Sequence, residues 1–411
     1  MTNIDYVSLL PHFLSKDLLL DALTVFPDYD DSVREENTVN RLMRLSDIYS
    51  LYLPSPMTLE IYNKLYLATV MSLQKKNSRV VIHQQNQTYK SIYSGDYHGI
   101  IGGADSFSIV GMSGIGKSSA IQRSISLITG GNIICTESPY TKVIPCLLVQ
   151  CPFDCSSKGL LLEILMRVDE VLGTSYYEKS VRSASTTDRL IGTVSNVALN
   201  HIGLLIIDEI QNVAGHKSGN SLLAMLTQLI NSSGISICFV GTPESIPFFE
   251  RAFQMARRAQ GLRYSRLEYG DFFKMFCRLA SRYQYVKNYS EISDGMVEYL
   301  YEHSGGIMSV VMSLLHDAQE IAICDGYELL DMKAMDKAYK KRLMLLHGFI
   351  EPSIKQIHAV KKRKSKVPRE MVNENLFGSE YLTITEIAEM SKNQGLDVVD
   401  ILNDYIVVEE V

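Results

Sequence analysis

The chain has 411 residues, of which 46% are hydrophobic and 21% charged, and its formal net charge is −6. This length allows two or three domains, and the charge balance excludes binding to nucleic acid through an overall basic excess, so any such contact needs a local patch. No stretch approaches the roughly 20 apolar residues of a membrane span, and the N-terminus, with Asp5, lacks the basic segment of a secretory signal. Seven cysteines show no paired CxxC spacing. We therefore expect reduced thiols in a cytoplasmic protein that has no membrane partner.

Residues 1–95 form an N-terminal region that we expect to be helical and to bind partners. Its clearest element starts at Ser55 and Pro56, since serine caps helix starts and proline suits the first turn. Apolar residues then recur at helical spacing over residues 57–73.

Residues 109–118 read IVGMSGIGKS, an apolar strand that runs into a glycine-rich loop and then a helix. This context is the one in which backbone N–H groups and a helix N-terminus bind phosphates. Lys117 would reach the β- and γ-phosphates, and the hydroxyl of Ser118 would bind Mg²⁺. The predicted ATP-binding residues are Gly111, Gly114, Ile115, Gly116, Lys117, Ser118, Ser119 and Asp208.

Asp208 and Glu209 follow a second apolar run, which we expect to be a central parallel strand. At the end of such a strand, Asp208 would join Ser118 in holding the metal, and Glu209 would polarise water. We predict strands at residues 107–110, 144–150, 204–208 and 235–242, with helices between them. Strands that alternate with helices imply a parallel α/β sheet over residues 96–270. Thr242, which ends the last strand, is placed to sense the γ-phosphate.

Residues 271–347 read as a small helical lid, because helix-length blocks are separated there by glycine or aspartate. Residues 348–411 form a C-terminal tail with a basic run at residues 361–366 and an acidic remainder. Such segregated charge is typical of an interaction segment, although a merely solvated linker explains the basic run equally well.

A nucleotide core followed by a helical lid is the layout of AAA+ ATPases. Two segments, GLLIIDEIQNV and FVGTPESIPFFERAFQMARRAQG, indicate a particular family of AAA+ ATPases. In these segments the chain resembles the TnsC/TniB family of AAA+ regulators of bacterial DNA transposons. The resemblance covers about residues 95–330. It implies that Gly111 to Ser118 form Walker A, that Asp208 and Glu209 form Walker B, and that Thr242 is sensor 1.

The resemblance also implies an arginine that reaches the γ-phosphate of a neighbouring subunit. Arg251, Arg257 and Arg258 are the candidates, and the sequence does not choose among them. Many AAA+ lids carry a further arginine after a Gly-Gly pair, but Ile307, Met308 and Ser309 follow Gly305-Gly306 here. This departure favours slow, regulatory hydrolysis.

The resemblance implies an ATP- and Mg²⁺-dependent homo-oligomer, a ring or a filament, on double-stranded DNA, with a transposase and a target-selector protein as partners. In the bacterial cytoplasm it would join the nucleoid when bound to DNA. Candidate phosphate contacts are Lys158 near a helix start, Lys179 and Arg182 in a polar stretch that suits a loop, and Arg189, although each is equally well an ordinary surface residue.

Three other functions stay open from the sequence. A replication initiator or helicase loader shares the core, but would need a winged-helix domain in the tail. A signalling NTPase switch would need repeats after the lid, and none of 20–50 residues occurs. A small-molecule kinase would need an acceptor pocket and lid arginines. GTP is disfavoured, since no NKxD-type guanine motif follows the core.

Overall fold

The computed structural model describes residues 5–77, 106–137, 140–154, 156–213, 219–251 and 261–344. The chain divides into two compact units, Met1–Gln356 and Ile357–Val411. The second unit, with the predicted basic run and acidic remainder of the tail, lies outside the described residues. The division at residues 95, 270 and 347 therefore stays a prediction.

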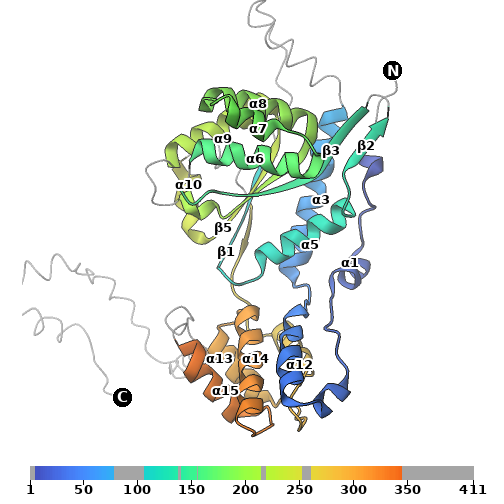
Figure 1. Cartoon of the computed structure of the whole chain (residues 1–411), viewed down its shortest axis with the longest axis vertical. Helices are drawn as coiled ribbons and strands as arrows, with labels where there is room; N and C mark the ends of the chain where they lie inside the picture. The colour runs from blue at the N-terminus through green and yellow to red at the C-terminus, as the bar shows by residue number, and fades with distance from the viewer. Residues whose placement is uncertain are drawn as a thin grey trace, which may run out of the picture. The chain divides into compact units, whose positions relative to one another are not determined.

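A six-stranded sheet organises the centre of the first unit (Figure 1). The strands are β1 (Phe107–Gly111), β2 (Ile134–Glu137), β3 (Tyr140–Gln150), β4 (Ile202–Asp208), β5 (Ser236–Gly241) and β6 (Leu262–Tyr264). Their order is β2-β3-β4-β5-β1-β6, and every neighbouring pair is parallel except β2 with β3. The strand before the P-loop, β1, is thus separated by β5 from β4, the strand that ends in Asp208.

The four strands predicted from the sequence are confirmed, with small shifts at their ends. The sequence did not indicate β2 and β6. Each is only three or four residues long at an edge of the sheet, so neither carries the continuous apolar run of a strand covered on both faces.

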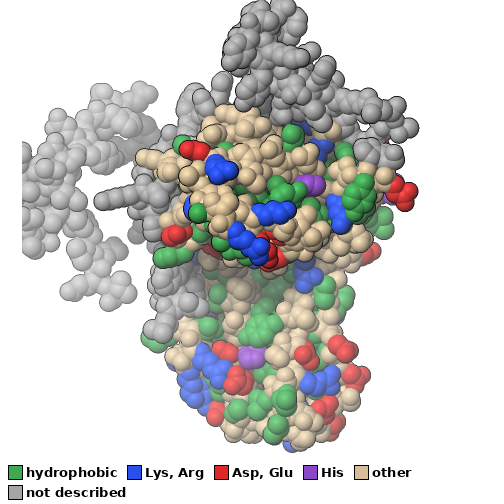
Figure 2. Space-filling view, turned by 45° about the horizontal axis from the view of Figure 1, so that its top comes forward, with side chains coloured by type: hydrophobic (Ala, Val, Ile, Leu, Met, Phe, Trp, Pro, Cys, Tyr) green, Lys and Arg blue, Asp and Glu red, His purple; other side chains and the backbone are tan. Residues whose placement is uncertain are grey.

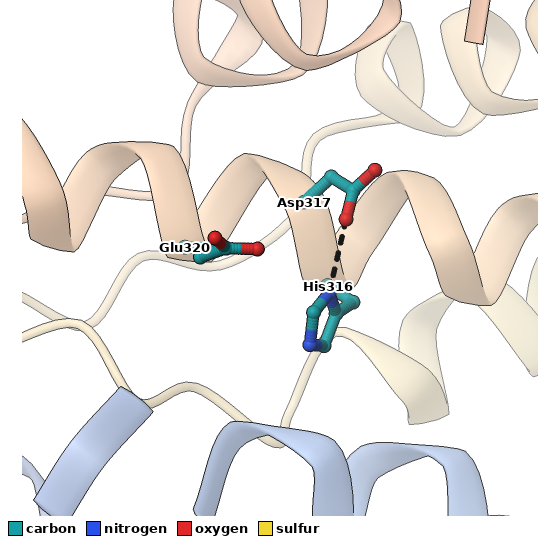
Figure 3. Close-up of side chains that lie close together, drawn as sticks. All are labelled: His316, Asp317 and Glu320. Atoms are coloured by element: carbon teal, nitrogen blue, oxygen red, sulfur yellow. Dashed lines mark hydrogen bonds and ion pairs between the residues drawn. The ribbon is translucent and has the colours of Figure 1, made fainter. Parts of the chain in front are cut away.

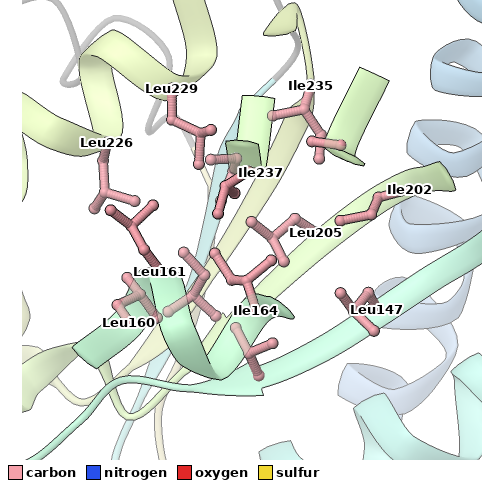
Figure 4. Packing of buried hydrophobic residues seen from close by; sticks show 14 of the residues in the cluster. Leu147, Leu160, Leu161, Ile164, Ile202, Leu205, Leu226, Leu229, Ile235 and Ile237 are labelled. Carbon is pink, nitrogen blue, oxygen red and sulfur yellow. The ribbon is translucent and has the colours of Figure 1, made fainter. Parts of the chain in front are cut away.

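Helices cover both faces of the sheet. The elements on one face are α6 (Ser157–Leu172), α7 (Tyr176–Arg182), α8 (Thr187–His201) and α9 (Gly219–Ser233), and those on the other are α1 (Lys16–Leu23), α3 (Pro56–Asn77) and α5 (Lys117–Thr129) (Figure 1). Figure 4 shows how Leu205 of β4 and Ile237 of β5 meet leucines of α6 and α9. Leu204 and Ile206 lie in the opposite core because successive side chains of a strand alternate between faces. This alternation, with both faces covered, explains the apolar run before Asp208.

The helix predicted after Ser55 is confirmed as α3, and the Ser55 hydroxyl accepts a hydrogen bond from the backbone N–H of Thr58. α3 packs on the sheet, where the Ser72 hydroxyl donates to the Gly203 carbonyl at 2.6 Å. Other short elements of the first unit are η1 (Val7–Leu9), η2 (Asp31–Glu35), α2 (Thr38–Arg44), η3 (Leu45–Ser50), η4 (Ile210–Val213), η5 (Pro243–Ser245) and α10 (Ile246–Arg251).

The predicted helical lid is also confirmed. It comprises α12 (Asp271–Ala280), α13 (Asp294–Ser304), α14 (Met308–Cys324), α15 (Met332–Ala338) and the π-helical turn η6 (Tyr339–Leu343). Val33, Leu45 and Ile48 of the N-terminal region belong to the same hydrophobic core as the lid helices. Arg41, which is fully buried, donates two hydrogen bonds of 2.6 and 2.7 Å to Glu328. The described N-terminal residues therefore pack against the sheet and form part of the core of the lid.

The polar stretch around Lys179 and Arg182 was predicted to suit a loop, and this is wrong: both residues lie on α7. The Asp169 carboxylate accepts hydrogen bonds from the backbone N–H groups of Tyr176 and Tyr177 at 2.9 and 2.7 Å, and so fixes the start of this helix. Among the described helices, none alone has the length and apolarity of a membrane span, although α13 and α14, bent by 119° at their break, meet the criterion as a pair.

Candidate nucleotide-binding site

The loop between β1 and α5 has the backbone of a phosphate-binding loop. Gly114 and Gly116 have φ values of +80° and +93°, which other residues rarely adopt. Gly111 is required for a different reason, since a Cβ there would lie 2.7 Å from the Ile115 side chain and 3.0 Å from the Tyr264 carbonyl oxygen. α5 begins at Lys117 with no side-chain cap. Its first N–H groups therefore face the loop, where a phosphate would be stabilised.

Lys117 is folded into this loop. Its side chain is buried, and the ammonium donates hydrogen bonds to the carbonyl oxygens of Gly111 and Met112 at 2.6 and 2.7 Å. Burial lowers the pKa of Lys117, while nearby carboxylates, that of Asp208 first, act in the opposite direction. The loop thus holds a cation at its centre, and the contact of Lys117 with the β- and γ-phosphates stays a prediction.

Walker A and Walker B meet directly. The Ser118 hydroxyl donates a hydrogen bond of 2.9 Å to Asp208 Oδ2, across 90 residues of sequence. Asp208 is buried at the end of β4, and its other oxygen accepts a hydrogen bond of 2.8 Å from the N–H of Glu209. A hydroxyl and a carboxylate at this separation are the hard oxygen ligands that Mg²⁺ prefers, so these two residues fit the predicted metal.

Glu209 stands next to this pair in an unusual conformation. Its φ is +60°, in the left-handed region where residues other than glycine are uncommon and strained. The side chain is exposed, and Oε2 accepts a hydrogen bond from the side-chain amide of Gln211. The Thr242 N–H donates to Gln211 Oε1 at 3.2 Å. Glu209 and Thr242, the predicted base and sensor, therefore lie on two sides of one glutamine that the sequence did not indicate.

Glu244 is a further acidic residue that the sequence did not indicate. It lies in η5, two residues after Thr242, and the nearby Thr242 side chain is the first of the influences that lower the pKa of the Glu244 carboxyl. The attraction of the Lys117 ammonium acts in the same direction. Three carboxylates therefore share the space around one lysine, and a cation is needed there when phosphates are added.

Arg251 is the last residue of α10, and the position of its side chain is not described. Arg257 and Arg258 lie outside the described residues. The role of these arginines in a neighbouring subunit stays a prediction.

A small pocket of about 210 Å³ opens beside the P-loop. Its walls come from the start of α3, the P-loop, the segment after β6 and the start of α14, namely Ser55, Pro56, Met57, Ile115, Arg263, Tyr264, Ser265, Leu267, Gly306 and Met308. Apolar walls next to a phosphate-binding loop suit the flat ring of a nucleotide base. No motif marks this pocket, because its residues come from four separate segments.

The lid touches the P-loop at the position where an arginine is absent from the sequence. The Ser309 hydroxyl donates a hydrogen bond of 3.0 Å to the Gly114 carbonyl. Gly114 allows this approach, since a Cβ on it would lie only 3.1 Å from the Ile307 side chain and 3.3 Å from Ser309 Oγ. A neutral serine therefore makes the lid contact in this chain, and slow hydrolysis stays a prediction.

The candidate DNA contacts are spread over three helices. Lys158 is exposed in the first turn of α6, and Lys179 and Arg182 are exposed on α7. Arg182 forms an exposed ion pair with Glu178 at 3.2 Å, and Arg189 is exposed in the first turn of α8. On the face drawn in Figure 2, Lys and Arg side chains are dispersed among acidic and uncharged ones. A DNA-binding role for these residues stays a prediction.

A second cluster of polar side chains lies in the lid, where His316, Asp317 and Glu320 of α14 could in principle hold a metal ion (Figure 3). His316 Nδ1 lies 3.0 Å from Asp317 Oδ1. However, Arg342 donates to Asp317 at 2.9 Å and to both oxygens of Glu320 at 2.5 and 2.9 Å. Both carboxylates are thus already neutralised, and the cluster is an ion-pair network that fastens η6 to α14.

Residues 102–269 match the family model described as "Bacterial TniB protein". The resemblance to the TnsC/TniB family is therefore confirmed over the segment that holds both Walker motifs and Thr242. No curated protein matches the sequence of this chain.

Several solved structures are similar in fold. The Aeropyrum pernix ORC2 protein is 15% identical over 64% of this chain and 68% of its own, with a TM-score of 0.40. The ORC1 protein of that organism, in complex with DNA, is 13% identical over 76% and 82%, with a TM-score of 0.41. Domain III of the Thermotoga maritima replication initiation protein DnaA is 13% identical over 67% and 94%, with a TM-score of 0.34. Such distant similarities carry no functional inference. The predicted fold class, an AAA+ P-loop core with a helical lid, is confirmed by the strand order and loop geometry described above.

Proposed function

We propose that this TniB-like chain is an ATPase that regulates bacterial DNA transposition. It binds ATP with Mg²⁺, assembles as a homo-oligomer on double-stranded DNA, and links a target-selector protein to transposase subunits in the bacterial cytoplasm. The single observation that carries the nucleotide chemistry is the 2.9 Å contact between Ser118 and Asp208, since it joins the two Walker motifs in one site. The link to transposition rests on the match of residues 102–269 to the TniB family.

In this proposal each residue has a definite task. The P-loop N–H groups and Lys117 bind the phosphates, and Ser118 and Asp208 hold the metal ion. The metal ion, when bound, neutralises charge that develops on the β- and γ-phosphates. Glu209 orients the attacking water and accepts its proton, and Thr242 contacts the γ-phosphate.

In this proposal, the chain assembles because the nucleotide site of one subunit is completed by an arginine of the next. One of Arg251, Arg257 and Arg258 supplies the positive charge at the γ-phosphate of a neighbouring subunit, so ATP bridges two copies of the chain. ADP lacks the group that this arginine contacts. We therefore expect oligomers with ATP and their loss with ADP.

DNA binding in this proposal uses exposed cations such as Lys158, Lys179 and Arg182. Contacts to phosphates give affinity without sequence preference and weaken strongly with salt. Filter binding of two unrelated duplexes at two salt concentrations tests this. A preference for one duplex, or affinity that salt does not change, would contradict the proposal.

The tail is proposed as the docking segment for a partner. A protein truncated after Gly348 should keep ATP-dependent assembly on DNA and lose recruitment of the transposase encoded with it. A truncated protein that no longer hydrolyses ATP would show instead that the tail belongs to the ATPase. Of the alternative functions, none is favoured by an observation on the described residues.

A further inference from the structure

We infer that Gln211 is the positioning residue for the Glu209 carboxylate and couples it to the end of β5. This inference rests on the proposed function, in which Glu209 activates water. It adds a role for a side chain to which neither the Walker motifs nor the sensor position assigns one.

The first step is that η4 is a rigid platform. Ile210, fully buried, anchors it in the hydrophobic core, and the Asn212 side-chain amide donates to the Cys151 carbonyl at 3.1 Å. The Asn212 N–H also donates to the Glu209 carbonyl at 3.0 Å and closes the turn. Gln211, between these two anchors, has a fixed backbone from which its side chain extends.

The second step is that the orientation of the Gln211 amide is dictated from both sides. The Thr242 N–H can only donate, so it faces the amide oxygen, at 3.2 Å. The ionised Glu209 carboxylate can only accept, so it faces the amide nitrogen. Both neighbours require the same orientation of the amide, and no other side chain of this length offers one acceptor and one donor in that order.

The third step is that the sheet leaves space for this amide. A Cβ on Gly241 would lie 2.9 Å from Gln211 Oε1 and 2.8 Å from the Ile210 side chain. Glycine at the end of β5 therefore lets the amide lie against the strand, next to the N–H of Thr242. The contact of Gln211 with the Thr242 N–H is therefore packed against the strand, while its contact with Glu209 lies at the exposed side of the site.

The consequence concerns the exposed carboxylate of Glu209. Glu209 has a strained backbone, and without a partner its side chain would sample several rotamers, few of which would direct an oxygen at the attacking water. The amide of Gln211 selects one of them. The same amide also contacts Thr242. A shift of Thr242 on contact with the γ-phosphate would therefore move the Gln211 amide and, with it, the Glu209 carboxylate.

The test uses two substitutions that separate the contacts. Gln211→Met keeps length and packing but removes both hydrogen bonds. Gln211→Glu keeps an acceptor for the Thr242 N–H but places negative charge against Glu209. Single-turnover hydrolysis of radiolabelled ATP and nucleotide affinity are measured for each variant, with Gln228→Met on the exposed face of α9 as the matched control.

Both Gln211 variants are expected to hydrolyse ATP at least about 10-fold more slowly, since misplacement by an ångström has effects of this size or more. Their ATP affinity should stay within about 2-fold, because neither contact involves the P-loop. In a Glu209→Gln background, Gln211→Met should cause no further loss, since it acts only through Glu209. Gln228→Met should match the wild type.

Three results would overturn the inference alone: wild-type rates in Gln211→Met, an equal loss of ATP affinity, or a full additional loss in the Glu209→Gln background. A wild-type protein that does not hydrolyse ATP would overturn the proposed function and this inference with it. The wild-type rate, measured first, distinguishes the two failures.

Discussion

The sheet and the lid each have a hydrophobic core, but they place their buried polar side chains differently. In the sheet, β4 is apolar up to Asp208, and the polar groups assigned to the proposed nucleotide site gather at the carboxyl ends of the strands, at Asp208 and directly after β5 at Thr242. The lid buries charged and polar side chains within its core, where Arg41 pairs with Glu328. The amide of Gln319 accepts from the Tyr285 N–H at 2.7 Å and donates to the Tyr283 carbonyl at 3.1 Å. These polar groups of the sheet thus serve the proposed nucleotide site, while the buried polar contacts of the lid join segments of its core.

This difference predicts that changes in the sheet affect catalysis and changes in the lid affect stability. The largest effect is expected at Lys117. Lys117→Ala should weaken ATP binding by at least about 100-fold, because it removes a positive charge at the phosphates. The free energy of unfolding without nucleotide should change little. Nucleotide titration and denaturant unfolding measure the two quantities, and unchanged affinity would remove the P-loop assignment.

Glu209→Gln is a second substitution at the edge of the sheet, and it tests hydrolysis separately from nucleotide binding. The variant should bind ATP normally and hydrolyse it about 100-fold or more slowly, the usual contribution of a general base. Single-turnover hydrolysis at saturating ATP measures this effect. A variant with wild-type turnover would show that another group, such as Glu244, performs this step.

On the lid side, Arg41→Ala should lower the free energy of unfolding by about 3 kcal/mol, because Glu328 would be left without its buried partner. Nucleotide affinity of the folded protein should be nearly unchanged. Urea unfolding gives the stability, and Arg44→Ala, which breaks partly exposed ion pairs with Glu36 and Asp47, is the matched control. Equal effects of the two substitutions would contradict the role given to Arg41.

The same pair predicts a pH dependence. The hydrogen bond from Arg41 lowers the pKa of Glu328 below its ordinary value. The resulting stabilisation is complete above the unfolded pKa of about 4.3 and is lost as the pH falls through the lower folded pKa. Glu328→Gln should therefore reduce the loss of stability on acidification. Urea unfolding at a series of pH values checks this. The same decrease in unfolding free energy at low pH in the variant and in the wild type would refute it.

The smallest effect is expected where the two regions meet. Ser309→Ala removes one neutral hydrogen bond to Gly114, which is worth about 1 kcal/mol, so ATP affinity should fall by about 5-fold at most. Ser309→Arg is the informative partner, since it restores the charge that many AAA+ lids carry. Faster hydrolysis in this variant would support the view that serine keeps the enzyme slow, and unchanged rates would count against it.

The elements of the fold that could be predicted are those whose signals lie within one continuous segment of the sequence. Glycines with positive φ, apolar strands covered on both faces and caps such as Ser55 each leave a local signal. β2 and β6 left none because they are short edge strands. α7 was missed because polar residues dominate it, and its start is fixed by Asp169, which belongs to the preceding helix.

The site divides in the same way. Lys117, Ser118 and Asp208 could be found because their motifs are contiguous and their chemistry requires these residue types. The pocket beside the P-loop and the Gln211 contacts could not be found, since they depend on how separate segments approach one another. Arg41 is the clearest case, because nothing in its own segment indicates a partner 287 residues away.

The most direct test of the central claim is negative-stain electron microscopy of the full chain with duplex DNA and Mg²⁺, with ATP or ADP. We expect rings or filaments on DNA with ATP, for the wild type and for Glu209→Gln, and none with ADP or for Lys117→Ala. Assembly that is the same with ATP and ADP, or no assembly of Glu209→Gln on DNA with ATP, would contradict an ATP-dependent regulator that acts on DNA.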